Sequence, residues 1–299
     1  MNNKKYRWII IYSVLLIATL LFNLGLHNFN FSQDTSQSLA IAHNNDRPVA
    51  TEIALAKPKV EVTAEKVNYA TVNGEKITGY FVQPKATTKP LPGIIAIHEW
   101  WGLNENIESV TRRLAGEGYQ VLAVDLYNGK VTESPQEALK LLQAVSKNPD
   151  PAKDNLKQAY EYLVNQNKAS KVGVIGWCFG GSWSLQTAIL LPKDIDATVI
   201  YYGGQIGDAT PEQLKTLQMP ILGIFGAEDA SIPVSTVRKF EKNLKELGKQ
   251  ADIQIYENAG HAFANPSGKN YVAETAQKAW TETTQFFQQY LESNTNLEK

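Results

Sequence analysis

Cysteine is almost absent from this chain of 299 residues, which has a single one, Cys178. One cysteine cannot form a disulfide within the chain, and it cannot build a cysteine-rich zinc site. The sequence also has no excess of charge of one sign: it contains 29 Lys and Arg and 30 Asp and Glu, which give a formal net charge of −1. No basic patch stands out, so the composition argues against nucleic acid as a partner.

Internal repeats and low-complexity segments are also missing from the sequence, while 43% of its residues are hydrophobic. This balance is typical of a globular protein that buries a substantial core. The oligomeric state is left open by the sequence.

The N-terminal residues contain a long uncharged run. Residues 8–26 are mostly aliphatic and follow Lys4, Lys5 and Arg7. Their length fits a transmembrane helix of ~20 residues better than the ~7–15 residues of a secretory signal. We therefore expect residues 1–27 to be an uncleaved signal anchor, with the lipid bilayer as a partner and the rest of the chain outside the cytoplasm. The alternative is signal cleavage near the A-x-A pattern of residues 40–42, which would give a secreted or periplasmic protein.

The remainder divides into a linker and one domain. Residues 28–59 are polar, have little helical or strand periodicity and are typical of a tether. The domain is expected over residues 60–299. It starts with alternating residues at 60–72 and 76–82 around Asn73-Gly74, the strongest short signal for a β-hairpin.

The rest of the domain alternates between two kinds of segment. Short apolar runs lie at 92–97, 120–124, 172–175, 197–201, 221–225 and 252–256. Stretches with helical periodicity lie at 104–117, 135–146, 151–166, 182–191, 234–247 and 271–292. Apolar strands alternating with amphipathic helices predict an α/β fold, a mostly parallel sheet with helices on both faces. The hairpin would supply antiparallel edge strands.

The sequence around Cys178 has the form G-x-C-x-G-G and joins an apolar run to a helical stretch. An α/β-hydrolase places its nucleophile on such a sharp strand-to-helix turn. Side chains at Gly176 and Gly180 would clash in so tight a turn. We therefore predict an α/β-hydrolase fold with Cys178 as its nucleophile, although a lone cysteine is more commonly an inert buried side chain.

A cysteine nucleophile needs a base and an orienting acid, which follow it along an α/β-hydrolase chain in the order acid, then histidine. His261 follows the run 252–256 and is the only histidine after residue 98. Asp229 follows the run 221–225, and its neighbour Glu228 is the competing candidate. Both loops lie beyond the C-terminal ends of predicted strands, where open parallel sheets build their sites.

The loop after the run 92–97 contains His98, Glu99, Trp100 and Trp101. In this fold that loop supplies one backbone donor of the oxyanion hole, here expected from Trp100, and Phe179 after the nucleophile supplies the other. Glu99 needs a partner, because a carboxylate at the end of an apolar strand is costly to bury. We expect His98 to be structural, and the tryptophans could equally belong to the core.

Five elements in this order resemble the dienelactone hydrolase family. They are Glu99 in His-Glu-Trp-Trp-Gly-Leu, Asp125-Leu126-Tyr127 after a strand, Cys178 in Gly-Trp-Cys-Phe-Gly-Gly, Asp229 and His261. The similarity extends over nearly all of residues 60–299. It implies hydrolysis of an ester or lactone, in the manner of a carboxymethylenebutenolidase, through an acyl-cysteine and without metal or cofactor. It also implies that Glu99 takes the proton of Cys178, that His261 serves the leaving group and water, and that Asp229 orients His261.

The substrate is less well defined. Family members hold a substrate carboxylate with two arginines, and the matching positions here are Gly129 and Asn265. We therefore expect an uncharged ester in an aromatic pocket, lined by Trp101, Tyr127, Trp177 and Tyr202. The alternatives are a thioesterase or acyl transferase on the same fold, or a non-catalytic binding module. A thiol redox sensor is disfavoured because the chain has no second, resolving cysteine.

Overall fold

The computed structural model describes residues 43, 46, 48, 57–87 and 89–292. These residues all belong to one compact unit of the chain. No helix among them is long and apolar enough to span a bilayer. The predicted anchor, residues 1–27, lies outside the described residues.

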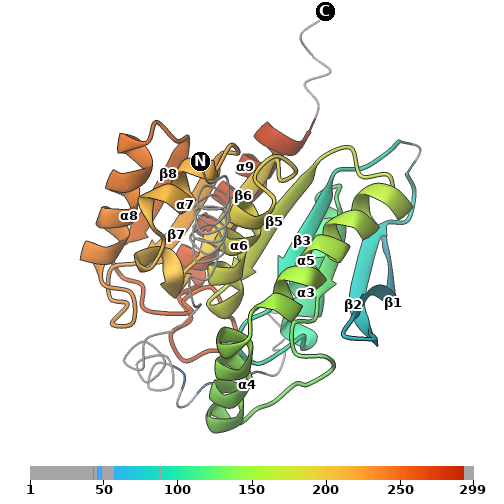
Figure 1. The fold of residues 1–299 in the computed structure, drawn as a ribbon, viewed down its shortest axis with the longest axis horizontal. Coiled ribbons are helices and arrows are strands. Elements are labelled where there is room, and N and C mark those ends of the chain that lie inside the picture. The colour runs from blue at the N-terminus through green and yellow to red at the C-terminus, as the bar shows by residue number, and fades with distance from the viewer. Residues whose placement is uncertain (1–42, 44–45, 47, 49–56, 88, 293–299) are drawn as a thin grey trace, which may run out of the picture. The chain divides into compact units, whose positions relative to one another are not determined.

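The described strands form one eight-stranded sheet in the order β1-β2-β4-β3-β5-β6-β7-β8 (Figure 1). β1 pairs with β2 and β2 with β4 in antiparallel fashion, and the other five pairings are parallel. The strands are β1 Val62–Val72, β2 Glu75–Pro84, β3 Gly93–Ile97, β4 Gln120–Val124, β5 Val172–Trp177, β6 Ala197–Tyr201, β7 Ile221–Gly226 and β8 Ala251–Tyr256. The predicted mostly parallel sheet with an antiparallel edge is confirmed.

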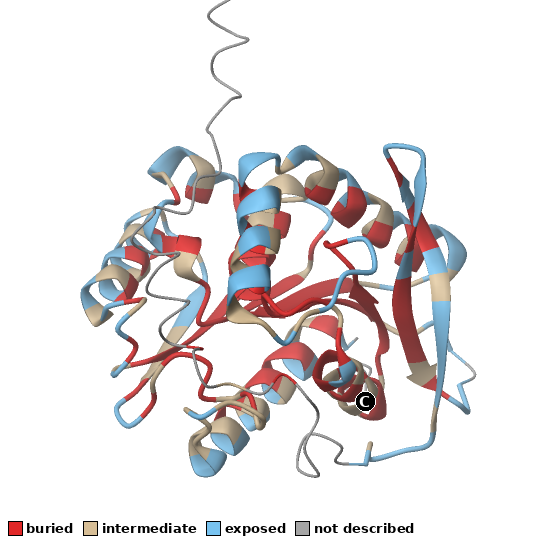
Figure 2. Cartoon of the chain, turned by 90° about the horizontal axis from the view of Figure 1, so that it is seen from below, coloured by how far each residue is buried: buried red, intermediate tan, exposed pale blue. Residues whose placement is uncertain are grey.

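Helices cover both sides of the buried strands (Figure 2). They are α3 Glu105–Gly116, α4 Pro135–Lys147, α5 Asp150–Glu161, α6 Phe179–Leu190, α7 Pro211–Thr216, α8 Val234–Glu246 and α9 Ala273–Leu291. A π-helical turn, Tyr162–Gln166, extends α5, so the predicted helix 151–166 exists but changes its winding at the end. The short helix α7 was not predicted, because six residues are too few to show helical periodicity.

The hairpin turn between β1 and β2 follows from two residues. Asn73 and Gly74 have φ of 51° and 83°, the left-handed backbone that a two-residue type I′ turn requires. Because this turn has the twist of the flanking strands, Val72 and Glu75 pair directly across it. The sequence signal Asn-Gly therefore predicts both the turn and its register.

The central strands place the site. Every residue of β3, β4, β5, β6 and β7 is buried, as expected for a sheet covered on both faces. Ile97 lies beside Gly176 across β3 and β5, and Trp177 lies beside Tyr201 across β5 and β6. The C-terminal ends of these strands are thus level, and the loops that follow them meet at one edge of the sheet.

Candidate active site

Cys178 lies on a sharp turn between β5 and α6. Its backbone has φ 55° and ψ −112°, a sparsely populated conformation for a residue with a side chain. The helix begins at Phe179, three residues earlier than periodicity indicated, because the turn itself is the start of α6. A Cβ on Gly176 would lie 2.2 Å from the carbonyl oxygen of Gly180, and a Cβ on Gly180 would lie 2.2 Å from that of Ile97. Backbone therefore packs directly on backbone at both glycines.

This contact yields a stability prediction. Gly180→Ala is expected to lower the free energy of unfolding by about 1–3 kcal/mol, since the added methyl group meets rigid backbone rather than a movable side chain. Thermal unfolding measures the change. Gly260→Ala is the matched control, because its Cβ would come no closer than 3.7 Å to any neighbour. Equal melting temperatures for the two variants would contradict the close approach.

Asp229 and His261 form a buried pair. Asp229 follows β7, and its Oδ2 lies 2.7 Å from Nδ1 of His261 in the loop after β8. The other oxygen, Oδ1, accepts hydrogen bonds from the backbone N–H groups of Ser231 at 2.8 Å and Ile232 at 3.0 Å. Glu228, the competing acid, is exposed. The Asp229 carboxylate therefore has a fixed orientation, and it leaves Nε2 of His261 as the free ring nitrogen.

This free nitrogen of His261 lies close to the thiol of Cys178. Nε2 of His261 is buried without a hydrogen-bond partner in the described part of the chain, and it lies within 4.8 Å of Cys178 Sγ. Burial lowers the pKa of His261, but the charges of Asp229 and Cys178 and the contacts with them together raise it to well above its ordinary value. Burial raises the pKa of Cys178, but the positive charge of His261 and the contact with His43 lower it to about 6. A thiolate beside an imidazolium is therefore the favoured state at neutral pH.

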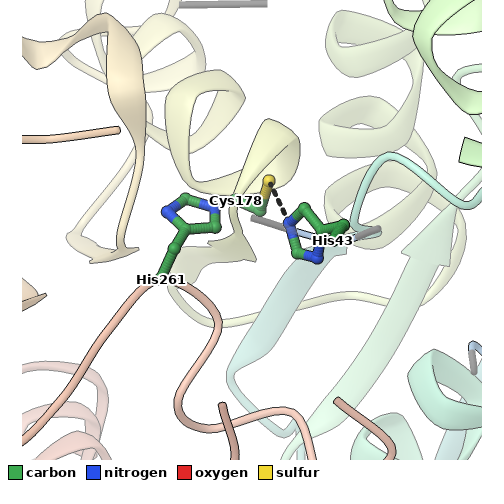
Figure 3. Close-up of side chains that lie close together, drawn as sticks. All are labelled: His43, Cys178 and His261. Carbon is green, nitrogen blue, oxygen red and sulfur yellow. Dashed lines mark hydrogen bonds between the residues drawn. The ribbon is translucent and has the colours of Figure 1, made fainter. Parts of the chain in front are cut away.

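His43 was missed by the sequence interpretation. It belongs to the segment predicted as a linker, yet it is fully buried, and its Nε2 lies 3.8 Å from Cys178 Sγ. Figure 3 shows the two imidazoles on opposite sides of the cysteine. Nδ1 of His43 lies 2.5 Å from Oδ2 of Asp46. An isolated His-x-x-Asp in a polar stretch carries no periodicity, and only the folded chain brings it to residue 178.

Glu99 has a different partner from the one that the resemblance implies. Its Oε2 accepts a hydrogen bond from Nδ2 of Asn265 at 2.6 Å, and its Oε1 has no partner among the described residues. Burial, and then the negative charge of Cys178, raise the pKa of Glu99 to about 8. The neighbours of the thiol are His43, at 3.8 Å, and His261, whose charge and contact lower the pKa of Cys178. Transfer of the thiol proton to Glu99 stays a prediction.

The predicted oxyanion donors lie in two segments that pack on each other at the start of α6. Phe179 is the first residue of α6, so its N–H is one of the four that a helix leaves without an internal partner. Trp100 lies in the loop after β3, whose carbonyls at Ile97 and His98 pack on Gly180 of the same helical turn. The role of both N–H groups stays a prediction.

His98 has the contacts of a structural histidine. Its Nε2 accepts a hydrogen bond from the backbone N–H of Leu126 at 3.1 Å, which leaves Nδ1 to donate to the carbonyl of Glu99 at 2.5 Å. Burial lowers the pKa of this ring, so it is neutral. The histidine thereby ties the loop after β3 to the loop after β4.

The four aromatic residues predicted for the pocket divide into two pairs. Trp177 and Tyr202 line a small cavity of about 50 Å³ together with Glu99, Asn265 and Arg113. Trp101 packs against Trp100, with ring centroids 4.9 Å apart, and Tyr127 packs against Phe179 at 5.2 Å. Arg113 is a cation that the sequence interpretation missed, because it lies in α3 and at neither of the two positions considered.

The thiol itself is closed off from solvent. Cys178 is 2% exposed. A larger hollow of about 520 Å³ is lined by His261, Lys269 and Tyr271, but Cys178 lines neither it nor the small cavity. Ligand pockets usually measure ~300–1,000 Å³, a range that includes the hollow beside His261 but not the small cavity beside Glu99.

A thiolate and two imidazoles are also donor types that zinc accepts. Donor atoms of Cys178, His43 and His261 lie within 4.8 Å of one another. Nucleophile, acid and histidine follow in the order of an α/β-hydrolase, so a catalytic role of Cys178 and His261 stays the prediction for this cluster.

Sequence comparisons identify related proteins. The profile of the Dienelactone hydrolase family matches residues 77–291. Protein usf of Aquifex pyrophilus is 34% identical over 226 residues, which cover 73% of this chain and 96% of that protein. A Methylorubrum extorquens protein named as a carboxymethylenebutenolidase is 32% identical over 256 residues, which cover 82% of this chain and 87% of that protein.

Solved structures show the same fold. A structure titled as a dienelactone hydrolase from Klebsiella pneumoniae superimposes with a TM-score of 0.69 at 28% identity, covering 77% of this chain and all 100% of that chain. A dienelactone hydrolase-like phosphotriesterase from metagenomic libraries gives 0.69 at 23% identity, covering 77% and 99% of the two chains. The second likeness is one of fold alone.

Proposed function

Because the chain belongs to the dienelactone hydrolase family, we propose that it hydrolyses an ester or a lactone through an acyl-cysteine intermediate on Cys178. The observation that carries this proposal is the thiol on its strained turn beside His261, which Asp229 holds by a 2.7 Å contact. A pKa of about 6 supports an ionised Cys178 at neutral pH, without help from the substrate.

The reaction then has two halves. In the first, Sγ of Cys178 attacks the carbonyl carbon, and the N–H groups of Trp100 and Phe179 stabilise the oxyanion. The C–O bond breaks as the Nε2 proton of His261 passes to the leaving oxygen, which in a lactone remains attached to the acyl group. In the second, the now neutral His261 takes a proton from water, which attacks the thioester and releases the acid and the thiolate. Asp229 stabilises the imidazolium in both halves.

We propose an uncharged substrate. Asn265, at one position where the family pattern has an arginine, is engaged with Glu99, and Gly129, at the other, has no side chain. The walls contributed by Trp177 and Tyr202 suit an apolar ester, and Arg113, the cation of the same cavity, stacks on the ring of Trp280 at 4.1 Å. The name of the Methylorubrum relative points to a butenolide, an unsaturated lactone, so a small lactone is the second substrate to compare.

The place of the reaction is a separate proposal that rests on the sequence alone. Residues 8–26 are uncharged and follow three basic residues, which favours an N-terminal anchor with residues 60–299 outside the cytoplasm. Signal cleavage would leave the same domain free in that compartment.

The test of the proposed reaction uses the single thiol. Purified enzyme is titrated with iodoacetamide, and turnover of p-nitrophenyl acetate and of a small unsaturated lactone is followed beside the extent of alkylation. We expect both activities to fall in proportion to alkylation of Cys178, and saturating substrate to slow the alkylation. Full turnover by fully alkylated enzyme would contradict a cysteine nucleophile.

A further inference from the structure

The N-terminal segment brings a second histidine–carboxylate pair to the nucleophile. His43 and Asp46 repeat the arrangement of His261 and Asp229: in each pair a carboxylate Oδ2 meets Nδ1 of the imidazole, at 2.5 Å and 2.7 Å. Each imidazole thus directs Nε2 toward Cys178, and the donor atoms of the three side chains lie within 4.8 Å of one another (Figure 3). One such pair is sufficient for the reaction proposed above, so the second needs its own explanation.

The pair is held by the body of the enzyme. Oδ1 of Asp46 accepts a hydrogen bond from the backbone N–H of Lys269 at 3.0 Å, in the same loop as His261. Two residues further on, the carbonyl of Pro48 accepts a hydrogen bond from Nδ2 of Asn104, the N-cap of α3. These contacts fix the carboxylate, and the carboxylate fixes the ring.

The surroundings of His43 favour a positive charge. The ring lies 5.0 Å from Trp100 and 5.2 Å from His261, measured between centroids, and it is fully buried. Burial lowers the pKa of His43, but its hydrogen bonds to Asp46 and to the Cys178 thiolate raise it to about 9. A charged imidazole without water around it stabilises a neighbouring thiolate more strongly than an exposed one would.

We propose that the pair His43–Asp46 holds Cys178 as a thiolate in the resting enzyme, with His43 as a further catalytic residue in direct contact with the nucleophile. The inference rests on the proposed acyl-cysteine reaction. The proton of the thiol passes from Sγ to Nε2 of His43, and the resulting imidazolium is balanced by Asp46. His43 keeps this proton during the reaction, while His261 exchanges its own with the leaving group and water. His43 thus supplies the proton-accepting role that the resemblance implies for Glu99.

Glu99 is less suited to that role in this chain. A resting thiolate needs an acceptor that is positively charged after taking the proton, whereas a carboxylate becomes neutral. Moreover, Glu99 holds Asn265 by a 2.6 Å hydrogen bond, and its own pKa is raised by burial to about 8. Beside the Cys178 thiolate its carboxyl group is mostly protonated at neutral pH, so it is not free to accept the proton of the thiol.

The charged groups around His43 come from several elements. They are Asp46 beside it, Cys178 at the start of α6, His261 and Lys269 in the loop after β8, and Glu99 in the loop after β3. Among these groups, only Cys178 is alkylated by iodoacetamide near neutral pH. The pH dependence of the alkylation rate therefore reports the ionisation of Cys178 and not that of the other groups.

The test is the pH dependence of Cys178 alkylation in the full-length protein in detergent. In the wild type we expect the rate constant to rise with a midpoint near pH 6. His43→Gln, which keeps a donor but not the charge, and His43→Ala are both expected to raise the midpoint by about 1–3 pH units. Asp46→Asn should raise it as well, and kcat/KM of His43→Gln should fall at pH 7 but recover above its new midpoint. Lys57→Gln, an exposed position of the same N-terminal segment, is the control and should match the wild type.

If His43 only shielded the thiol from solvent and had no electrostatic effect on it, the alkylation rates would differ from these expectations. His43→Ala would then be alkylated faster at every pH with an unchanged midpoint, and His43→Gln would behave as the wild type. An unchanged midpoint in both variants overturns the assignment. The alkylation measurement requires no substrate, so it is independent of the proposed reaction. If the protein hydrolysed no ester but the His43 variants still shifted the midpoint, the role of His43 would hold and the proposed reaction would be rejected.

Discussion

Replacing Cys178 with alanine is expected to abolish hydrolysis of both ester and lactone, with kcat falling by about 10⁴-fold or more. The variant loses the atom that forms the acyl intermediate, while the oxyanion donors and the pocket remain. Because the members of a catalytic triad act as a unit, the remaining hydrolysis rate should be close to the rate that substrate binding and oxyanion stabilisation support alone. Initial rates with p-nitrophenyl acetate at pH 7 measure the loss.

Cys178→Ser controls for the backbone at this position. The residue has φ 55°, and serine keeps the size of the side chain in that conformation. Its hydroxyl is not ionised by neighbours that lower a thiol pKa to about 6, so the variant should fold normally and hydrolyse far more slowly than the wild type. An alanine variant that retained a tenth of wild-type kcat would reject Cys178 as the nucleophile.

Asp229→Asn has the second largest expected effect, a fall in kcat of about 10³–10⁴-fold. Asparagine would keep the shape of the side chain but remove the charge that raises the pKa of His261 to well above its ordinary value. His261 would then be largely neutral at pH 7 and unable to protonate the leaving group. The same loss raises the pKa of Cys178, so the alkylation midpoint should move upward together with the loss of turnover.

Glu228→Gln is the matched control for this variant. It removes one negative charge from the adjacent residue, which is exposed. We expect kcat within about twofold of wild type, since exposed charges act weakly through solvent. If kcat fell by a similar factor in Glu228→Gln and Asp229→Asn, the total negative charge of the loop, and not the contact of Asp229 with His261, would determine the activity.

The fold was largely predictable because its signals are local. Short, mostly apolar runs predicted six of the strands, and Asn73-Gly74 predicted the hairpin with its register. The start of α6 was placed three residues late, because glycines and a strained cysteine hide a helix start that the turn geometry imposes. The order of strands in the sheet required the structure, since pairings such as β2 with β4 depend on contacts distant along the chain.

The site was predictable where a motif fixes a position. Cys178, Asp229 and His261 each follow a strand, and parallel strands bring such positions to one edge. His43 lies 135 residues before Cys178 in sequence, within a polar segment of no periodicity, and its importance arises only from a long-range contact. The partner of Glu99 was likewise hidden, because the contact with Asn265 spans 166 residues.

The proposed acyl-cysteine intermediate can be observed directly. Full-length enzyme mixed with p-nitrophenyl acetate is quenched in acid within milliseconds, digested and examined by mass spectrometry. The account predicts one acetyl group on the peptide that contains Cys178, formed and lost at the rate of turnover and removed by neutral hydroxylamine as a thioester would be. Turnover without that adduct, or with the acetyl group on another residue, would contradict it.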